Sequence, residues 1–262
     1  MKVSVIISTY NSPTYLKKVL ESFRFQIRPP DEIVVADDGS GQDTGEVIQN
    51  ASACGNFPLL HVWQENQGFR AGKIRNAGIA RSSGEYIILL DGDCVVGRHF
   101  VSDHLALAQK GYFIQGKRIL VSKEAMANFD CYHANSSQSL WKMALQGRLS
   151  NIHHLIRLPF VIASRNKKLA GIKSCNMSFF KDDVIAINGF NEDYIGWGNE
   201  DSDLACRLIK YGLAKKISPF MAICFHLWHP TNKTVGDLNR DLLENAIRSD
   251  TYVCKNGIVK KS

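Results

Sequence analysis

The sequence predicts an α/β fold in which a mostly parallel central sheet is covered by helices on both faces. Three observations support this fold class. Short apolar runs alternate with stretches of helical period, the runs are apolar throughout, and each ends in polar turn residues. Parallel strands that are buried on both faces have this continuous apolar character. Such sheets bind their ligands beyond the carboxyl ends of the strands.

Composition narrows the class of protein further. The chain has 262 residues, 45% of them hydrophobic and 22% charged, as is ordinary for a globular protein. Its net charge of +7 favours anionic partners such as nucleotides or an acidic membrane surface. We see no aromatic-interleaved basic stripe and expect no nucleic-acid partner. The seven cysteines form no CxxC pair, which predicts reduced thiols in a cytoplasmic protein.

The first half of the chain predicts strands and helices in strict alternation. Strands are expected at 3–8, 33–36, 59–65 and 85–93, with helices at 13–26, 43–54 and 72–83 between them. The first helix shows apolar residues at a helical period. Asn11 or Ser12 is its candidate cap, with Pro13 in the first turn. The strand ends place three polar clusters, STYN, DDGS and DGDC, on one edge of the sheet.

The second half is less regular. Residues 111–121 predict a strand pair or one long strand, 124–158 are mainly helical, and 165–169 resemble a flexible surface segment. Leu204, Leu208 and Tyr211 have helical spacing, and 235–247 predict a closing helix. The range 110–170 is a candidate mobile lid. No repeat or linker interrupts the chain, so we predict one domain over 1–262, with no membrane span.

Asp91 and Asp93 flank Gly92 at the end of an apolar strand. Two carboxylates in this place can hold Mg²⁺ or Mn²⁺, which prefer oxygen ligands and share them with substrate phosphates. The alternative is an acidic turn that only closes the strand, because Asp and Gly are turn formers.

Two more clusters suit a bound nucleotide. One carboxylate of DDGS, Asp37 to Ser40, would accept hydrogen bonds from a base or ribose, or the segment is a turn or a helix cap. Arg70, Lys73 and Arg75 would offer positive charge to a diphosphate, with Arg75 able to bind it bidentately. The alternative interpretation is that these three residues form a solvated basic face of a helix.

Trp197 lies between two glycines and precedes acids at 200, 201 and 203. The glycines indicate a loop where a substrate approaches the backbone. Acids in a first turn complement the helix dipole, and Asp201 or Ser202 would cap the helix. One cap explains a single acid, so a carboxylate here is a candidate general base toward a sugar hydroxyl.

His226 and His229 lie three residues apart in CFHLWHP. A neutral imidazole binds transition metals and favours Mn²⁺ over Mg²⁺. Either histidine alone also fits an ordinary structural or surface role.

These stretches occur in a fixed order: STYN, DDGS, ENQGFRAGKIRNAG, LLDGDC, the run from CNMSFF to CRL, and FHLWHP. Together, residues 2–230 resemble a family 2 glycosyltransferase of the GT-A fold. The second half is similar to the galactosyltransferase-type C-terminal segment of bacterial chondroitin-polymerase-like enzymes and animal β-1,4-galactosyltransferases. The resemblance implies a nucleotide-binding half at 1–95 and an acceptor-binding half with its closing helix at 96–262.

The resemblance also implies roles on the nucleotide side of the site. It places Thr9, Tyr10 and Asn11 near the nucleotide. Asp38 would bind the uracil ring with support from Asp37, and Arg75 would approach the nucleotide or its diphosphate.

Metal and catalytic roles follow from the same resemblance. Asp93 would be the direct ligand of Mn²⁺ or Mg²⁺, with Asp91 beside it and His226 completing the set. His229 is the alternative histidine, because HLWH leaves the register open by three residues. Asp201 is the first candidate for the base and Glu200 the second. Trp197 would line the acceptor site.

The implied reaction is an inverting transfer of galactose, N-acetylgalactosamine or N-acetylglucosamine from a UDP-sugar to a glycan hydroxyl. An α-linked donor would give a β-linked product. With no anchor, stem or second catalytic module expected, a stand-alone cytoplasmic enzyme of bacterial surface polysaccharide or lipooligosaccharide synthesis fits best. A lipid-linked acceptor would bring it to the inner membrane face.

Two alternatives belong to other functional classes. A nucleotidyltransferase would carry a glycine-rich basic loop after the first strand, where this chain reads STYNSPTYL. An inactive nucleotide- or glycan-binding module would have a broken D-x-D motif or a missing base. An intact D-x-D motif and a candidate base are both present here, which favours an active transferase.

Overall fold

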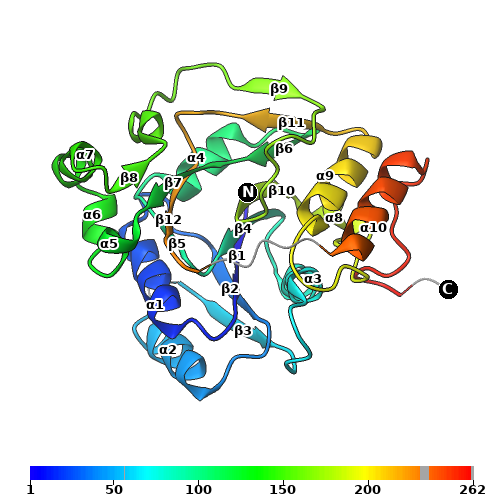
Figure 1. Cartoon of the computed structure of the whole chain (residues 1–262), viewed down its shortest axis with the longest axis horizontal. Helices are drawn as coiled ribbons and strands as arrows, with labels where there is room; N and C mark the ends of the chain where they lie inside the picture. The colour runs from blue at the N-terminus through cyan, green and yellow to red at the C-terminus, as the bar shows by residue number, and fades with distance from the viewer. Residues whose placement is uncertain (56, 231–235, 261–262) are drawn as a thin grey trace.

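The computed structural model describes residues 1–55, 57–230 and 236–260. Its larger sheet has eight strands in the order β3-β2-β1-β4-β10-β6-β11-β9 (Figure 1). The bounds of these strands are β1 Val3–Thr9, β2 Glu32–Asp37, β3 Leu59–Trp63, β4 Tyr86–Asp91, β6 Tyr112–Gln115, β9 Ser164–Asn166, β10 Asn176–Phe180 and β11 Ala214–Ile217.

A smaller four-stranded sheet has the order β5-β12-β7-β8. Its strands are β5 Cys94–Val96, β7 Lys117–Val121, β8 Leu149–Ser150 and β12 Ile223–Leu227. The helices are α1 Pro13–Ser22, α2 Gln42–Ala53, α3 Ala71–Arg81, α4 Phe100–Leu107, α5 Lys123–Met126, α6 Cys131–Ala134, α7 Ser137–Leu145, α8 Lys181–Ala186, α9 Glu200–Lys210 and α10 Asp237–Arg248. Short 3₁₀ helices cover Phe23–Phe25 and Ile152–Leu155.

The α/β fold with a central sheet between helices is confirmed. β3, β2, β1 and β4 are parallel neighbours, as the apolar runs of the first half predict. β10 then pairs antiparallel with both β4 and β6, and β9 pairs antiparallel with β11. Strands from both halves of the chain therefore share one sheet.

Alternate side chains of β1 enter two different cores. Val5 and Ile7 pack with Leu16 of α1 and with the smaller sheet. Ile6, between them, packs on the opposite face with Ile74 of α3 and with residues of α9. Both faces of the strand are thereby removed from water, which explains its uninterrupted apolar run.

The second half departs from the sequence prediction in several places. Residues 111–121 form two strands, one of the two predicted arrangements, but Gly116 divides them between the two sheets and they do not pair with each other. The prediction of a flexible surface segment at 165–169 is wrong in part, because Arg165 and Asn166 belong to edge strand β9. The closing helix is present as α10, while Val235 lies outside the described residues.

Short strands account for most of what the sequence analysis missed. β5, β10, β11 and β12 have three to five residues each. Periodicity over so few positions does not separate a strand from other apolar segments. The mobility of a lid at 110–170 stays a prediction.

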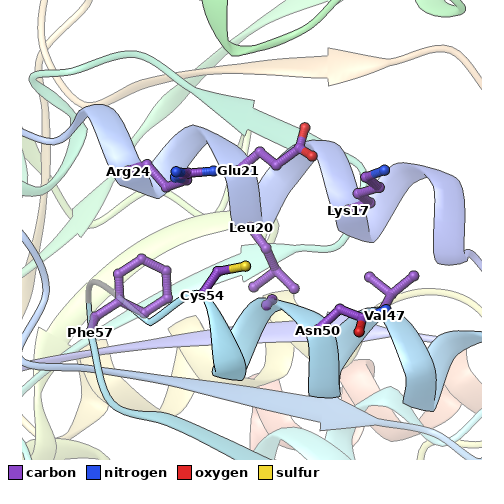
Figure 2. A pocket seen from close by; sticks show the side chains of 9 residues that line it. Lys17, Leu20, Glu21, Arg24, Val47, Asn50, Cys54 and Phe57 are labelled. Atoms are coloured by element: carbon purple, nitrogen blue, oxygen red, sulfur yellow. The ribbon is translucent and has the colours of Figure 1, made fainter.

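A cavity of about 240 Å³ opens between α1 and α2 (Figure 2). Leu20, Val47 and Phe57 are apolar residues of its lining, and Lys17 and Arg24 are charged ones. None of the predicted site residues lines it. No helix within the described residues is both long and apolar enough to cross a membrane.

Candidate functional site

The candidate site lies at the carboxyl ends of β1, β2 and β4. The register of the sheet sets Thr9 of β1 opposite Asp37 of β2, and Ser8 opposite Asp91 of β4. Gly92 lets the turn after β4 approach β1 closely, because an added Cβ would lie 3.0 Å from the Ser8 carbonyl oxygen. The three polar clusters predicted for one sheet edge therefore do meet there.

Asp37 and Asp38 have different environments. The Asp37 carboxylate accepts the Ser40 backbone N–H at 2.8 Å and contacts His61 Nε2 at 3.0 Å. Burial acts to raise the pKa of Asp37, but these contacts outweigh it and leave the pKa below its ordinary value. Asp38 accepts the Arg70 backbone N–H at 2.8 Å and a bond from Gln64. Asp37 is thus enclosed by the turn that carries Asp38.

The turn after β1 is held against the turn after β2. The Asn11 backbone N–H donates to Ser40 Oγ at 2.8 Å, and Asn11 Oδ1 accepts from the Gly41 N–H at 2.9 Å. Tyr10 is partly exposed, and its hydroxyl accepts from Asn66. Thr9 Oγ1 is buried with no hydrogen-bond partner among the described residues. An unpaired buried hydroxyl beside such turns suits a polar ligand.

Arg75 of α3 connects two parts of the site. Its Nη2 lies 2.9 Å from Asp91 Oδ1, and its Nη1 lies 3.3 Å from Glu200 Oε1. Ser8 Oγ donates to the same Asp91 oxygen at 2.9 Å. Burial acts to lower the pKa of Arg75, but its two carboxylate neighbours outweigh this and raise it. The guanidinium stays charged at the centre of the site.

Asp93 has separate partners from Asp91. Its Oδ2 lies 3.0 Å from His229 Nε2 and 3.6 Å from His226 Nε2. One ligand atom from each residue falls within 4.8 Å of the other two, which makes them a candidate metal group. An oxygen and two imidazole nitrogens suit Mn²⁺ better than Mg²⁺. The donor set therefore fits a transition metal, and it includes both histidines of CFHLWHP.

The sheet pairing explains how His226 reaches Asp93. β12 runs antiparallel to β5 and sets His226 opposite Cys94, next to Asp93. His229 lies beyond the end of β12, and its Nδ1 lies 3.0 Å from the Pro230 carbonyl oxygen. A backbone partner at Nδ1 leaves Nε2 to face a metal. Strand β12 was not predicted, so sequence reasoning could not choose between the two histidines.

The three groups influence one another's protonation. Burial acts to raise the pKa of Asp93, but the His229 contact and both imidazoles outweigh it and lower the pKa. The bond to Asp93 raises the pKa of His229. Burial lowers the pKa of His226 despite the nearby carboxylate. An ionised carboxylate beside a neutral His226 is the state that a metal ligand set requires.

Helix α9 brings Glu200 and Asp201 to the site. Asn199 is the residue before its first turn, in the left-handed region at φ 74°, so the prediction of Asp201 or Ser202 as the cap is wrong. Burial raises the pKa of both carboxyl groups, although Arg75 acts to lower each of them. A carboxylate with a raised pKa is a stronger base, which suits proton abstraction.

The third acid of the stretch has a structural role. Asp203 accepts bonds from Arg207 Nε at 2.9 Å and Nη2 at 2.6 Å within α9. Arg207 Nη1 donates to the carbonyl oxygens of Ile187 and Gly189. This buried pair joins α9 to the end of α8.

Trp197 lies on the loop before α9 and is 42% exposed. Gly196 and Gly198 on either side have φ of 77° and 105°, a region that favours glycine. The Asn239 side chain of α10 donates to the carbonyl oxygens of Ile195 and Gly198 and fixes both ends of the loop. The closing helix thereby positions the tryptophan, a link that the sequence spacing did not show.

Two family models match the chain. The model described as glycosyl transferase family 2 matches residues 4–170, and the model described as the N-terminal domain of galactosyltransferase matches residues 158–230. The two matches meet near residue 160, in the range that sequence periodicity resolved least.

Curated relatives and solved structures agree with these matches. Validoxylamine A glucosyltransferase of Streptomyces hygroscopicus subsp. limoneus is 26% identical over 236 residues, which cover 82% of this chain and 49% of the relative. GalNAc(5)-diNAcBac-PP-undecaprenol beta-1,3-glucosyltransferase of Campylobacter jejuni is 31% identical over 125 residues, covering 47% of this chain and 40% of the relative. The chain thus spans about half or less of each relative's length. Residues 1–349 of S. aureus TarS in complex with UDP-GlcNAc superpose with a TM-score of 0.62 at 18% identity, covering 88% of this chain and 60% of that one.

Proposed function

The chain belongs to glycosyl transferase family 2, and from this premise we propose that it is an inverting, metal-dependent transferase. It moves galactose, N-acetylgalactosamine or N-acetylglucosamine from a UDP-sugar to a glycan hydroxyl. The observation that carries the proposal is the group formed by Asp93, His226 and His229 beyond the carboxyl ends of the strands. Ligands of parallel α/β sheets bind at that edge.

The donor side of the reaction uses the first half of the chain. Asp38 binds the uracil ring, and Asp37 holds the turn that presents it. Thr9, Tyr10 and Asn11 line the nucleotide, and the unpaired Thr9 hydroxyl gains a polar partner there. The fold likeness to a protein crystallised with UDP-GlcNAc supports a nucleotide-sugar donor.

Asp93, His226 and His229 would hold Mn²⁺, with Mg²⁺ the poorer match to the two imidazoles. A bound metal supplies positive charge against the diphosphate as the nucleotide departs. Asp91 contacts Arg75 and Ser8, so we assign it to positioning that guanidinium near the diphosphate. Its predicted role as a second ligand stays open to the metal-binding test below.

The acceptor side uses α9 and the loop before it. Asp201 takes the proton from the acceptor hydroxyl as oxygen attacks the anomeric carbon, and Glu200 is the second candidate for this role. Trp197 lines the acceptor site. Attack opposite the leaving group inverts the anomeric centre and gives a β-linked product from an α-linked donor.

The pathway is bacterial surface polysaccharide or lipooligosaccharide synthesis on the cytoplasmic side of the membrane. A relative whose name specifies an undecaprenol-linked acceptor supports a lipid-linked glycan for this chain as well. We include UDP-glucose among the donors to be tested, because both named relatives are glucosyltransferases.

Donor hydrolysis tests the proposal directly. The protein is incubated with a panel of UDP-sugars and Mn²⁺, and UDP release is followed with and without EDTA. We expect one donor to give metal-dependent release, and Asp93→Ala to abolish it. Asp250→Ala is a matched control, because Asp250 is exposed and lies outside the site.

Calorimetric titration with UDP and Mn²⁺ separates the remaining outcomes. If UDP and Mn²⁺ do not bind, the hypothesis of a nucleotide-sugar donor is refuted. UDP binding without turnover on any donor and acceptor would favour the inactive module. Asp91→Ala measured in the same titration shows whether that carboxylate also binds the metal.

A further inference from the structure

The net positive charge of the chain comes from one segment. Residues 131–181 contain eight of the 32 Lys and Arg residues and none of the 25 Asp and Glu residues. This segment therefore carries +8, while the rest of the chain carries −1. Such separation concentrates the electrostatic attraction for an anionic partner on one part of the molecule.

The same segment holds the most exposed large apolar side chains. Leu145 and Ile162, each 88% exposed, and Phe160 at 78% are the three most exposed large apolar side chains of the described residues. Trp141 lies one helical turn before Leu145 on α7, so the two share a face. Isolated exposed apolar residues are ordinary, whereas this segment exposes several of them within a short stretch of positively charged sequence, which indicates an interaction surface.

We name residues 141–168 the basic-apolar rim, because they run along the outside of the molecule from α7 to β9 (Figure 1). Among the ion pairs of the described residues, none involves Arg165, Lys167 or Lys168. Arg157 differs, since it bonds Asp103 of α4 at 2.6 Å and anchors the loop. The rim thus combines these three cations with exposed apolar side chains on a loop that Arg157 anchors.

We infer that the basic-apolar rim binds the surface of an anionic lipid bilayer. Lysine and arginine attract the negative charge of the cytoplasmic leaflet, while leucine, isoleucine and phenylalanine enter the boundary between headgroups and acyl chains. Single-stranded nucleic acid would instead need aromatic side chains as stacking platforms. The rim's two most exposed apolar side chains, Leu145 and Ile162, are aliphatic and exceed the aromatic Phe160 and Trp141 in exposure, which favours lipid.

The rim leads into the candidate acceptor site. Lys173 follows Lys168 by five residues, and its positive charge acts to lower the pKa of the Asp201 carboxyl group. The Ser174 backbone N–H lies 3.4 Å from Asp201 Oδ2. A bilayer at the rim would therefore present a lipid-linked acceptor close to the proposed base. This last step rests on the proposed function, whereas lipid binding itself does not.

Vesicle co-sedimentation tests the inference without donor or acceptor. The vesicles are phosphatidylcholine with about one third phosphatidylglycerol, and phosphatidylcholine alone. We expect binding to the anionic vesicles only, with weakening as salt rises from about 0.1 M to about 0.5 M. Lys167→Gln/Lys168→Gln should weaken partitioning roughly 25-fold, from about fivefold per charge. Phe160→Ser/Ile162→Ser should weaken it by about tenfold or more.

Matched controls lie outside the rim. Ile27→Ser removes an apolar side chain that is 60% exposed, and Lys17→Gln/Lys255→Gln removes two exposed charges. Both controls should bind anionic vesicles like the unmodified chain. Failure of the unmodified chain to bind anionic vesicles, or equal binding by rim and control variants, would overturn the inference. Metal-dependent UDP release in solution, measured on the same samples, shows whether the proposed function stands apart from that outcome.

Discussion

Asp91 and Asp93 are one residue apart in the sequence, but their carboxylates contact different neighbours. Asp91 contacts Arg75 and Ser8, whereas Asp93 contacts His229 and lies near His226. The sequence motif predicts that both acids lie at the end of a strand. It cannot show that they contact different neighbours, because those neighbours come from α3 and from the end of β12.

The two candidates for the general base, Glu200 and Asp201, have different surroundings. Glu200 lies 3.3 Å from the buried Arg75 guanidinium, while Asp201 Oδ2 faces the Ser174 backbone N–H at 3.4 Å. A carboxylate paired with a fixed cation is a weaker base than one that is not. The geometry therefore favours Asp201 for proton abstraction and Glu200 for holding Arg75.

We predict that Asp201→Asn lowers kcat by about 10²–10⁴ while the donor KM changes little. Glu200→Gln should instead raise the donor KM, because Arg75 loses a partner. The measurement is steady-state transfer to the first acceptor that supports turnover. Activity of the unmodified chain should also fall on the acid side of an apparent pKa above that of an ordinary aspartate, since burial raises the pKa of Asp201. Equal kcat for Asp201→Asn and the unmodified chain would reassign the base.

At the scale of elements, α4 is joined to the central sheet by a buried polar chain. His104 Nε2 lies 2.9 Å from Asn176 Oδ1, and its Nδ1 lies 2.8 Å from Ser178 Oγ, both on β10. Tyr86 of β4 lies 2.8 Å from the same Ser178 hydroxyl. Because Asn176 Nδ2 donates to two carbonyl oxygens, its Oδ1 accepts from His104 Nε2. Burial of the ring disfavours a second imidazole proton on Nδ1.

These hydrogen bonds between buried side chains predict a specific loss of stability in acid. Burial lowers the pKa of His104 to about 4 from the ordinary 6.5. Between these values the unfolded chain binds a proton that the folded chain excludes. The free energy of unfolding is therefore full above about pH 6.5 and falls by about 3 kcal/mol as pH drops to about 4.

Urea unfolding of the unmodified chain and of His104→Asn, at about pH 7 and about pH 4.5, measures this contribution. The variant lacks the titrating group, so the difference in stability between the two proteins should shrink in acid. The carboxylates titrate equally in the two proteins, so their contributions cancel from the comparison. A difference independent of pH would show that His104 is protonated in the folded state.

The regular alternation of elements explains how much of the fold could be predicted. The first four strands and three helices were predicted close to their observed bounds, because strands and helices alternate there and polar turn residues mark the strand ends. β12 has only five residues, yet its pairing with β5 delivers His226 to Asp93. The link from Asn239 to the Trp197 loop joins residues 41 or more positions apart. Neither contact leaves a local signal in one sequence.

At the scale of the whole molecule, the two halves of the chain are interleaved in one sheet. β4 ends the predicted nucleotide-binding half, and its neighbour β10 comes from the predicted acceptor-binding half. The candidate metal group likewise joins Asp93 to two histidines from the end of the chain. Separating the halves would expose β4 as an unpaired apolar edge.

We therefore predict one cooperative unfolding transition for residues 1–262, with equal calorimetric and van't Hoff enthalpies. UDP at about 100 times its Kd, in the presence of Mn²⁺, should add about 2.7 kcal/mol to the free energy of unfolding. For a chain of this size that raises Tm by about 5–10 °C. EDTA should reverse the shift, Asp93→Ala should lack it, and Asp250→Ala should keep it. Two separate transitions, with only one moved by UDP and Mn²⁺, would mean that the halves are independent domains and that the ligand binds within one of them. A single transition that moves as a whole would mean that the two halves unfold together and share the stabilisation by the bound donor, as expected if β4 and β10 join them in one sheet.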